Sequence, residues 1–260
     1  MVVVTSNQRD VIFDAVRAMY TDVAHHPDRE FHFPTGRPAC LHLGYPADVL
    51  DRLPPEVVAS FAGVGYPFAA DVVAPGNTVL DIGSGSGTDT FIAAHLVGPA
   101  GKVIGLDMTA PMREKLAAFA RSQGLTTVET LDGNAEQIPL PDACVDVVTS
   151  NGVLNLVPDK TAAFRELGRV LVRGGRLQLS DIVVGTLPSA ACRAEPQLWA
   201  ECIVGATTDR DYFTMLEQAG LTNIEILSQH DYFANSASAE TRKVAAGFGA
   251  HAITLRAIKE

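Results

Sequence analysis

The chain contains few of the residues that build metal sites or disulfide frameworks: 4 of its 260 residues are cysteine and 1 is tryptophan. No two cysteines have the C-x-x-C spacing and none belongs to a cluster with histidine, so we expect neither a zinc site nor disulfides. His25 and His26 are sequence neighbours rather than partners one helical turn apart, and Pro27 follows them, as is typical of a loop. The sequence therefore predicts no bound metal.

Basic residues are also scarce, because 20 lysines and arginines stand against 30 acidic residues and the net charge is −10. Binding to phosphate backbones requires clustered basic side chains, and no basic block is present, so we expect no nucleic-acid partner. No apolar run approaches the length of a bilayer span, and the first ten residues contain no charged leader before a long apolar stretch. We expect a cytoplasmic protein without a membrane partner, and its oligomeric state stays open.

Hydrophobic residues, by contrast, make up 47% of the chain, enough for a full core in one domain with additions. From Thr78 onward, strand-like and helix-like stretches alternate, which predicts an α/β fold with a doubly wound, seven-stranded, mostly parallel sheet. This core is expected over residues 76–260, with its ligand at the carboxyl ends of the strands. The predicted strands span residues 78–82, 102–107, 126–131, 144–150, 175–181, 222–229 and 251–258.

Two segments lie outside this alternating pattern. Residues 1–75 form a predicted N-terminal helical and irregular cap: apolar positions at helical spacing predict a helix over 8–24, prolines and glycines predict an irregular stretch over 25–46, and a helix is expected over 54–62. Residues 183–208, between the fifth strand and the next helix, form a predicted insert.

A glycine-rich loop follows the first predicted strand. Gly83, Gly85 and Gly87 remove side chains where the chain turns sharply and allow a ligand to approach the backbone. The helix that begins near Gly87 directs its free amide groups toward the same place. Asp107, at the end of the second strand, is placed to accept hydrogen bonds from the two hydroxyls of a ribose. Together these residues predict a site for an adenosine-containing cofactor.

The spacing of the glycines argues against a dinucleotide. The dinucleotide pattern G-x-G-x-x-G requires a third glycine where this chain has Thr88, so a dehydrogenase is the weakest interpretation. Asp81, two residues before the loop, can hold the ammonium group of a cofactor that carries an amino acid.

At these residues the chain resembles the class I S-adenosylmethionine-dependent methyltransferases, whose fold is Rossmann-like, and the similarity covers roughly residues 60–185. Segment 133–139 resembles the part that receives the adenine, with Asn134 in place of the usual aspartate; its amide oxygen can accept the same hydrogen bond. Segment 145–151 resembles the fourth strand. The resemblance implies that S-adenosylmethionine is bound by Asp81, Gly83, Ser84, Gly85, Gly87, Asp107, Met108, Asn134, Ala135 and Asn151.

Three further segments resemble those that distinguish the arsenite methyltransferases: residues 61–68, 150–160 and 199–206. In that family each segment carries a cysteine, and the three thiolates hold trivalent arsenic, a soft centre that prefers sulfur ligands. In this chain the first two positions are Val64 and Gly152, and only Cys202 remains.

One thiolate cannot form a three-sulfur site. The chain therefore recruits other cysteines, such as Cys40 or Cys192, or binds an arsenical that already carries organic or thiol substituents, or acts on an acceptor without arsenic. Cys144 lies in an apolar run and is expected in the core.

In the methyltransferases that this chain resembles, additions such as 1–75 and 183–208 cover the cofactor and select the acceptor. The candidate acceptor residues are Tyr20, His32, Phe33, Cys40, His42, Tyr45, Gly152, Trp199 and Cys202. The leading hypothesis is methyl transfer from S-adenosylmethionine to a small molecule, with trivalent arsenic or another thiophilic acceptor as the sharper version. The alternatives are an O-, N- or C-methyltransferase of secondary metabolites, for which His32 and His42 are candidate bases, and a non-catalytic binder of S-adenosylmethionine.

Overall fold

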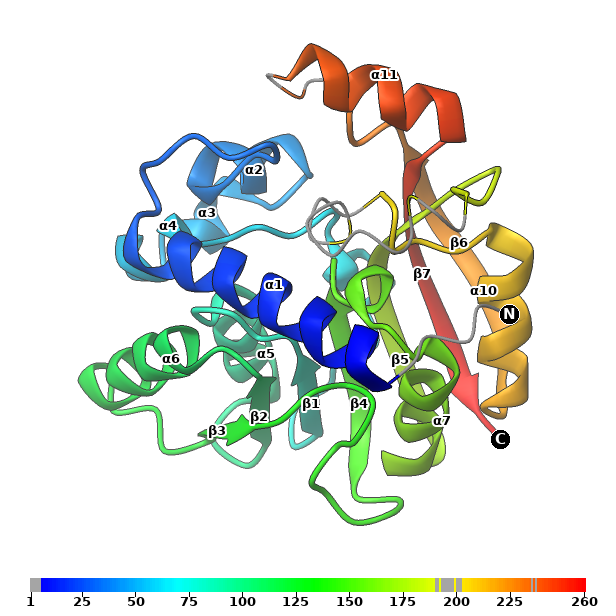
Figure 1. Cartoon of the computed structure of the whole chain (residues 1–260). Helices are drawn as coiled ribbons and strands as arrows, with labels where there is room; N and C mark the ends of the chain where they lie inside the picture. The colour runs from blue at the N-terminus through cyan, green and yellow to red at the C-terminus, as the bar shows by residue number, and fades with distance from the viewer. Residues whose placement is uncertain (1–5, 190–191, 193–198, 200–202, 235, 237) are drawn as a thin grey trace.

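The computed structural model describes residues 6–189, 192, 199, 203–234, 236 and 238–260. Seven strands of these residues form one sheet in the order β3-β2-β1-β4-β5-β7-β6 (Figure 1). β7 is antiparallel to both of its neighbours, and the other pairs are parallel. The strands are β1 Thr78–Ile82, β2 Lys102–Asp107, β3 Val128–Asp132, β4 Val145–Asn151, β5 Leu171–Val183, β6 Leu221–His230 and β7 His251–Lys259. The predicted fold is confirmed.

The helices differ from the prediction mainly before the sheet. They are α1 Ser6–His25, α2 Gly36–His42, α3 Ala47–Leu50, α4 Pro55–Ala59, α5 Thr88–Val97, α6 Ala110–Ser122, α7 Lys160–Val170, α10 Asp209–Gln218 and α11 Ala239–Phe248, with 3-10 turns η1 Pro67–Ala70 and η2 Leu154–Leu156. The expectation that residues 25–46 are irregular is wrong for α2. Pro38 stands in the first turn, where a missing N–H costs no helical hydrogen bond, and Ala39 and Cys40 are buried.

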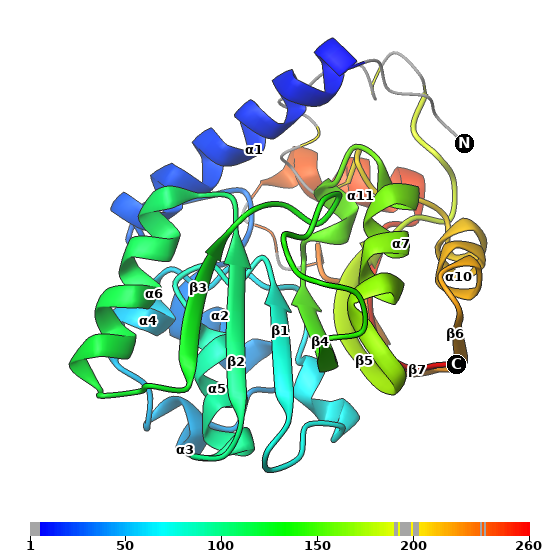
Figure 2. The same cartoon turned by 90° about the horizontal axis from the view of Figure 1, so that it is seen from below.

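The core has two layers because successive side chains of each strand point to opposite faces of the sheet. Leu80 of β1 packs in one cluster with Tyr212 of α10 and residues of α7, whereas Val79 packs in another with Ile92 of α5. Figure 2 shows α7 in front of the sheet, and α2, α3 and α5 behind it. No helix within the described residues is both long and apolar enough to cross a membrane.

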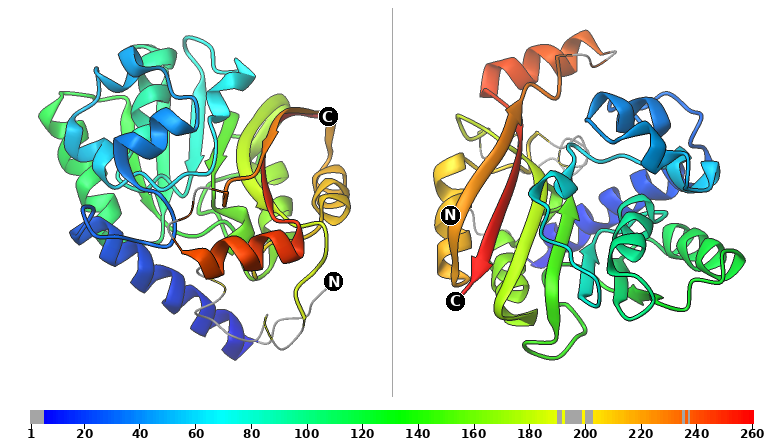
Figure 3. Two further views of the ribbon diagram at one scale, coloured as in Figure 1. Left: turned by 90° about the horizontal axis from the view of Figure 1, so that it is seen from above. Right: turned by 180° about the vertical axis from the view of Figure 1, so that it is seen from behind.

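The carboxyl ends of the parallel strands are covered by α1. In Figure 2 this helix runs diagonally beyond the arrowheads of β1, β2 and β4, and Figure 3 shows α11 on the same side of the molecule as these carboxyl ends. Ile12, Val16 and Val23 form the buried side of α1. The predicted N-terminal segment therefore packs where the sequence predicts the ligand. Part of the predicted insert 183–208 lies outside the described residues.

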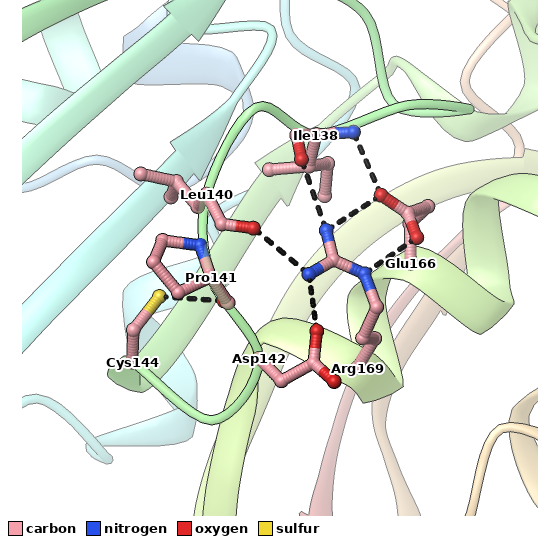
Figure 4. A network of polar contacts seen from close by, with 7 residues as sticks. All are labelled: Ile138, Leu140, Pro141, Asp142, Cys144, Glu166 and Arg169. Atoms are coloured by element: carbon pink, nitrogen blue, oxygen red, sulfur yellow. Dashed lines mark hydrogen bonds and ion pairs between the residues drawn. The ribbon is translucent and has the colours of Figure 1, made fainter.

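Arg169 of α7 holds the loop between β3 and β4 in place through hydrogen bonds (Figure 4). Its guanidinium donates to the carbonyls of Ile138 and Leu140 and to the carboxylates of Asp142 and Glu166, at 2.6–2.9 Å. These contacts fix the segment that follows Ala135. Cys144, expected in the core, is only partly buried at the edge of this loop; its thiol donates to the Pro141 carbonyl at 3.0 Å.

Candidate cofactor and acceptor site

A cavity opens at the carboxyl ends of β1, β2 and β4, beneath α1. All the residues predicted to hold the cofactor line it except Gly87, which packs behind the loop against Phe91. On the opposite side it is lined mainly by apolar residues of α1, the 61–63 segment, α6 and η2, including Phe13, Val16, Tyr20, Phe61, Ala62, Met112, Leu156 and Val157. The cavity thus has a polar floor and an apolar cover.

The glycine loop after β1 forms a cradle that suits a ligand. Gly83 has φ +70°, and a Cβ there would clash with Val153. Gly85 has φ +53°, and a Cβ there would stand in open space. The Ser84 hydroxyl is buried and has no hydrogen-bond partner among the described residues. Because a buried polar atom without a partner is costly, the loop provides a donor or acceptor for a ligand.

Asp107 of β2 lies on the other side of the glycine loop. Its carboxylate accepts from the backbone N–H of Gly85 at 2.8 Å and from that of Thr109 at 2.7 Å. A carboxylate oxygen can accept two hydrogen bonds, so Asp107 can accept from a ribose hydroxyl in addition to these donors. Burial raises the pKa of Asp107, and these backbone donors lower it.

Two further carboxylates line the cavity beside the loop. Asp81 accepts from the Thr90 hydroxyl at 2.6 Å, and Asp89 accepts from the Tyr45 hydroxyl at 2.6 Å and from the Asn151 amide at 3.0 Å. Burial and the charge of Asp89 raise the pKa of Asp81 to about 8, and burial raises the pKa of Asp89 to about 6. A buried, partly protonated pair of this kind is stabilised by a cationic ligand.

The segment predicted to receive the adenine also reaches the cavity. The Asn134 amide oxygen accepts from the Glu136 backbone N–H at 2.9 Å, so one of its lone pairs is used locally and one remains. The Glu136 carboxylate is buried, accepts from the Asp159 N–H at 2.7 Å and forms an ion pair with Arg9 of α1. This ion pair holds the N-terminal part of α1 beside the segment predicted to receive the adenine.

On the acceptor side, the two positions predicted to match the first two family cysteines are in contact. A Cβ added at Gly152 would lie 3.1 Å from Val64 Cγ1, and Val64 is 1% exposed. No cysteine is among the described residues that line the cavity. Gly152 lines the cavity and Val64 packs behind it, so neither of these two positions supplies the thiolate that the resemblance would place there.

Residues 74–220 match a family described as a methyltransferase domain. This chain belongs to that family. It is 40% identical over 184 residues to the arsenite methyltransferase of Halobacterium salinarum, which covers 71% of the chain and 47% of that protein. It is 36% identical over 185 residues to that of Aquipseudomonas alcaligenes, which covers 67% of the chain and 52% of that protein.

Among solved structures, the arsenic(III) S-adenosylmethionine methyltransferase from Chlamydomonas reinhardtii superposes with a TM-score of 0.70 at 33% identity, over 87% of this chain and 74% of that one. The methyltransferase described here spans about half the length of the curated relatives it matches. The comparisons confirm the predicted S-adenosylmethionine-dependent methyltransferase family, its cofactor S-adenosylmethionine, and the resemblance to arsenite methyltransferases.

The remaining cysteines of this methyltransferase do not gather at the cavity in the described structure. Cys40 is fully buried within α2 and does not line the cavity, and burial raises the pKa of its thiol far above the usual range. Cys192 is half-buried, and its sulfur accepts from the Ser189 hydroxyl at 3.3 Å. Cys202 lies outside the described residues. Of the described residues, no group of three His, Cys, Asp or Glu could hold a metal.

The other candidate acceptor residues divide between the cavity and its surroundings. Tyr20 lines the cavity, whereas His32 is half-buried against Phe33 and His42 is exposed, and neither histidine lines it. Trp199 is buried behind the wall, where its indole N–H donates to the Leu156 carbonyl at 2.8 Å. The candidate bases therefore lie away from the site.

Sequence reasoning missed Asp89 and most of the apolar residues by which the predicted N-terminal cap lines the cavity. Asp89 stands in the first turn of α5 directly after the glycine loop, which is the signal that could have identified it. The residues of α1 that line the cavity belong to the apolar stripe of the predicted helix, but the stripe alone does not say what it covers.

Proposed function

We propose that this chain transfers the methyl group of S-adenosylmethionine to a small, largely apolar molecule through a soft atom, either sulfur or trivalent arsenic that already carries organic substituents. Residues 1–75 act as the cap that covers the site. The observation that carries the proposal is the part of the wall formed by Gly152, with the apolar side chain of Val64 packed behind it, because it lacks the thiolates that inorganic arsenite would need.

The polar floor of the cavity fits the cofactor. Ser84 and Gly85 would bind it through the unpartnered hydroxyl and the open cradle, Asp107 would accept from the ribose hydroxyls, and Asp81 would balance the ammonium group. When bound, S-adenosylmethionine supplies a methyl carbon activated by a neighbouring sulfonium.

The residues of the cover exclude water and hold the acceptor. Phe13, Val16 and Leu156 surround the acceptor side with apolar surface, which suits an organic substituent. A hydroxyl acceptor would need a base within hydrogen-bond reach, and no histidine is among the described lining residues. Two carboxylates that line the cavity, Asp81 and Asp89, already accept from Thr90, Tyr45 and Asn151 beside the glycine loop. A thiolate or a trivalent arsenic atom needs no proton removed during attack, so the site performs this transfer by orientation alone.

The test is a panel of acceptors with methyl-labelled S-adenosylmethionine and purified protein. The panel contains arsenite with glutathione, methylarsonous acid, thiophenol, phenol and aniline. We expect label in the products of methylarsonous acid or thiophenol, and little in the others. Transfer only to phenol or aniline would replace this proposal by the hard-acceptor alternative, and binding of S-adenosylhomocysteine without any transfer would make the protein a sensor.

A double variant, compared with its two single variants, tests this part of the wall directly. In Val64→Cys/Gly152→Cys two thiols face one another, so the double variant should retain arsenite through gel filtration, whereas each single variant should not. Gly152 has φ +72°, so its substitution costs about 1–2 kcal/mol, and a thermal melt serves as the folding control. Equal retention of arsenite by the parent protein would mean that thiolates already reach this wall.

A further inference from the structure

Behind the acceptor wall, a buried set of hydrogen bonds joins three distant parts of the chain. Tyr45 follows α2, Asp89 begins α5, and Asn151 ends β4. The Tyr45 hydroxyl donates to Asp89 Oδ1 at 2.6 Å, and Asn151 Nδ2 lies 3.0 Å from both Asp89 Oδ2 and the Tyr45 oxygen. Tyr45 is 2% exposed and does not line the cavity. Its hydroxyl therefore acts only through its neighbours.

This set fixes the orientation of the Asn151 amide. A carboxylate only accepts hydrogen bonds, so Asp89 requires the amide nitrogen of Asn151 on its side. The amide oxygen then faces the other way, where it accepts from the backbone N–H of Val64 at 2.8 Å and of Gly65 at 3.3 Å. The same amide nitrogen also lies 3.0 Å from the Gly65 carbonyl. The Asn151 side chain thus holds the loop that carries Val64 through hydrogen bonds to its backbone.

The fit between this loop and Asn151 is tight. A Cβ added at Gly63 would lie 2.5 Å from Asn151 Nδ2, and one added at Gly65 would lie 2.5 Å from the Ser180 hydroxyl oxygen. The loop can approach the end of β4 only because both positions are glycine. Small changes in the position of Asn151 therefore move Val64 relative to the Gly152 turn.

We propose that Tyr45 and Asp89 are positioning residues for the acceptor: they orient Asn151, and Asn151 holds the 63–65 loop so that Gly63 and Gly152 form the acceptor wall with Val64 packed behind it. This inference rests on the proposed function. Asp89 must be ionised to accept from both donors, and because burial raises its pKa to about 6, the set is complete above that pH.

The test compares Tyr45→Phe with Tyr66→Phe. The two rings pack together with centroids 4.6 Å apart, but only Tyr45 places its hydroxyl on Asp89. We expect Tyr45→Phe to raise the amide hydrogen exchange of Val64 and Gly65 by about fivefold, the scale of one weakened hydrogen bond, and Tyr66→Phe to leave it unchanged. Affinity for S-adenosylhomocysteine, measured by calorimetry, should stay within about twofold in both variants because neither ring lines the cavity.

Kinetics separate positioning from general loss of structure. With methylarsonous acid as acceptor, Tyr45→Phe should raise the KM for the acceptor about fivefold and leave the KM for S-adenosylmethionine unchanged. Asp89→Asn, which turns an amide toward that of Asn151, should raise the same exchange rates more strongly. Unchanged exchange in both variants, or equal increases in Tyr45→Phe and Tyr66→Phe, would overturn the inference. If no acceptor is methylated, the exchange experiment still decides it, and only the proposed function fails.

Discussion

Replacement of Asp81 by asparagine should stabilise the cofactor-free protein and impair its binding of S-adenosylmethionine. Asp81 is buried beside the glycine loop, where burial and the charge of Asp89 raise its pKa from 3.8 to about 8. An asparagine of the same size can still accept from the Thr90 hydroxyl, which donates to Asp81 at 2.6 Å. The substitution therefore removes a buried charge and keeps the packing.

The direction of this change in stability follows from proton binding. Between pH 3.8 and about pH 8 the folded protein keeps the proton of Asp81 and the unfolded chain loses it, so the parent protein loses stability as the pH rises through this range. Each pKa unit corresponds to about 1.4 kcal/mol, which gives an upper limit of about 6 kcal/mol. We expect Asp81→Asn to raise the free energy of unfolding by about half of this limit, roughly 3 kcal/mol at pH 8, because Asp89 titrates in the same range.

Thermal melts of the cofactor-free proteins at pH 4, 6 and 8 measure this effect. For a chain of this size, about 3 kcal/mol corresponds to an increase in Tm of about 6–12 °C at pH 8, which should vanish near pH 4. Asp146→Asn, at the amino end of β4 and away from the cavity, is the control for the loss of one carboxylate. A difference between Asp81→Asn and the parent that does not grow with pH would refute the reasoning. S-adenosylhomocysteine should raise the Tm of the parent and not that of the variant.

Three further predictions concern the loop, the cover and the thiols. Gly83→Ala should weaken S-adenosylhomocysteine binding at least tenfold by calorimetry, because its Cβ would clash with Val153 at a positive φ; unchanged affinity would contradict the cradle. Arg9→Gln removes the ion pair with Glu136, so stopped-flow measurements should show faster dissociation of S-adenosylhomocysteine, by about threefold, and not slower. Cys40→Ala should keep methyl transfer within about twofold of the parent, and a loss above tenfold with intact folding would place this thiol in the reaction.

The floor of the site was predictable because its residues are local in sequence. The glycine loop and the aspartate before it form one strand–loop–helix unit, and Asp107 ends the strand paired with β1. Parallel strands bring their carboxyl ends to one edge, so adjacent strand ends in a predicted sheet imply neighbouring side chains. Asn151 and Gly152 were placed at the site by the resemblance to the methyltransferases, and both line the cavity.

The acceptor side was predictable only in part. The histidines and Cys40 were candidates because they lie in the N-terminal segment, but α2 turns Cys40 into the core and leaves His42 exposed. Tyr45 was expected to line the pocket and instead stands behind it, on Asp89. The composition of a segment indicates which residues are available, and the packing of short helices decides which way each one points.

Periodicity and glycine spacing predicted the fold class and a site for an adenosine-containing cofactor, because each depends on residues within one strand, loop or helix. The resemblance to the methyltransferases implied S-adenosylmethionine and showed the absence of two family cysteines. The tertiary structure alone decided that Val64 meets Gly152, that α1 covers the cavity, and that Tyr45, Asp89 and Asn151 form one set. Tyr45 and Asp89 are 44 residues apart, and Tyr45 and Asn151 are 106 apart. Hydrophobic burial is not directional, so only the complete packing of the chain selects these contacts.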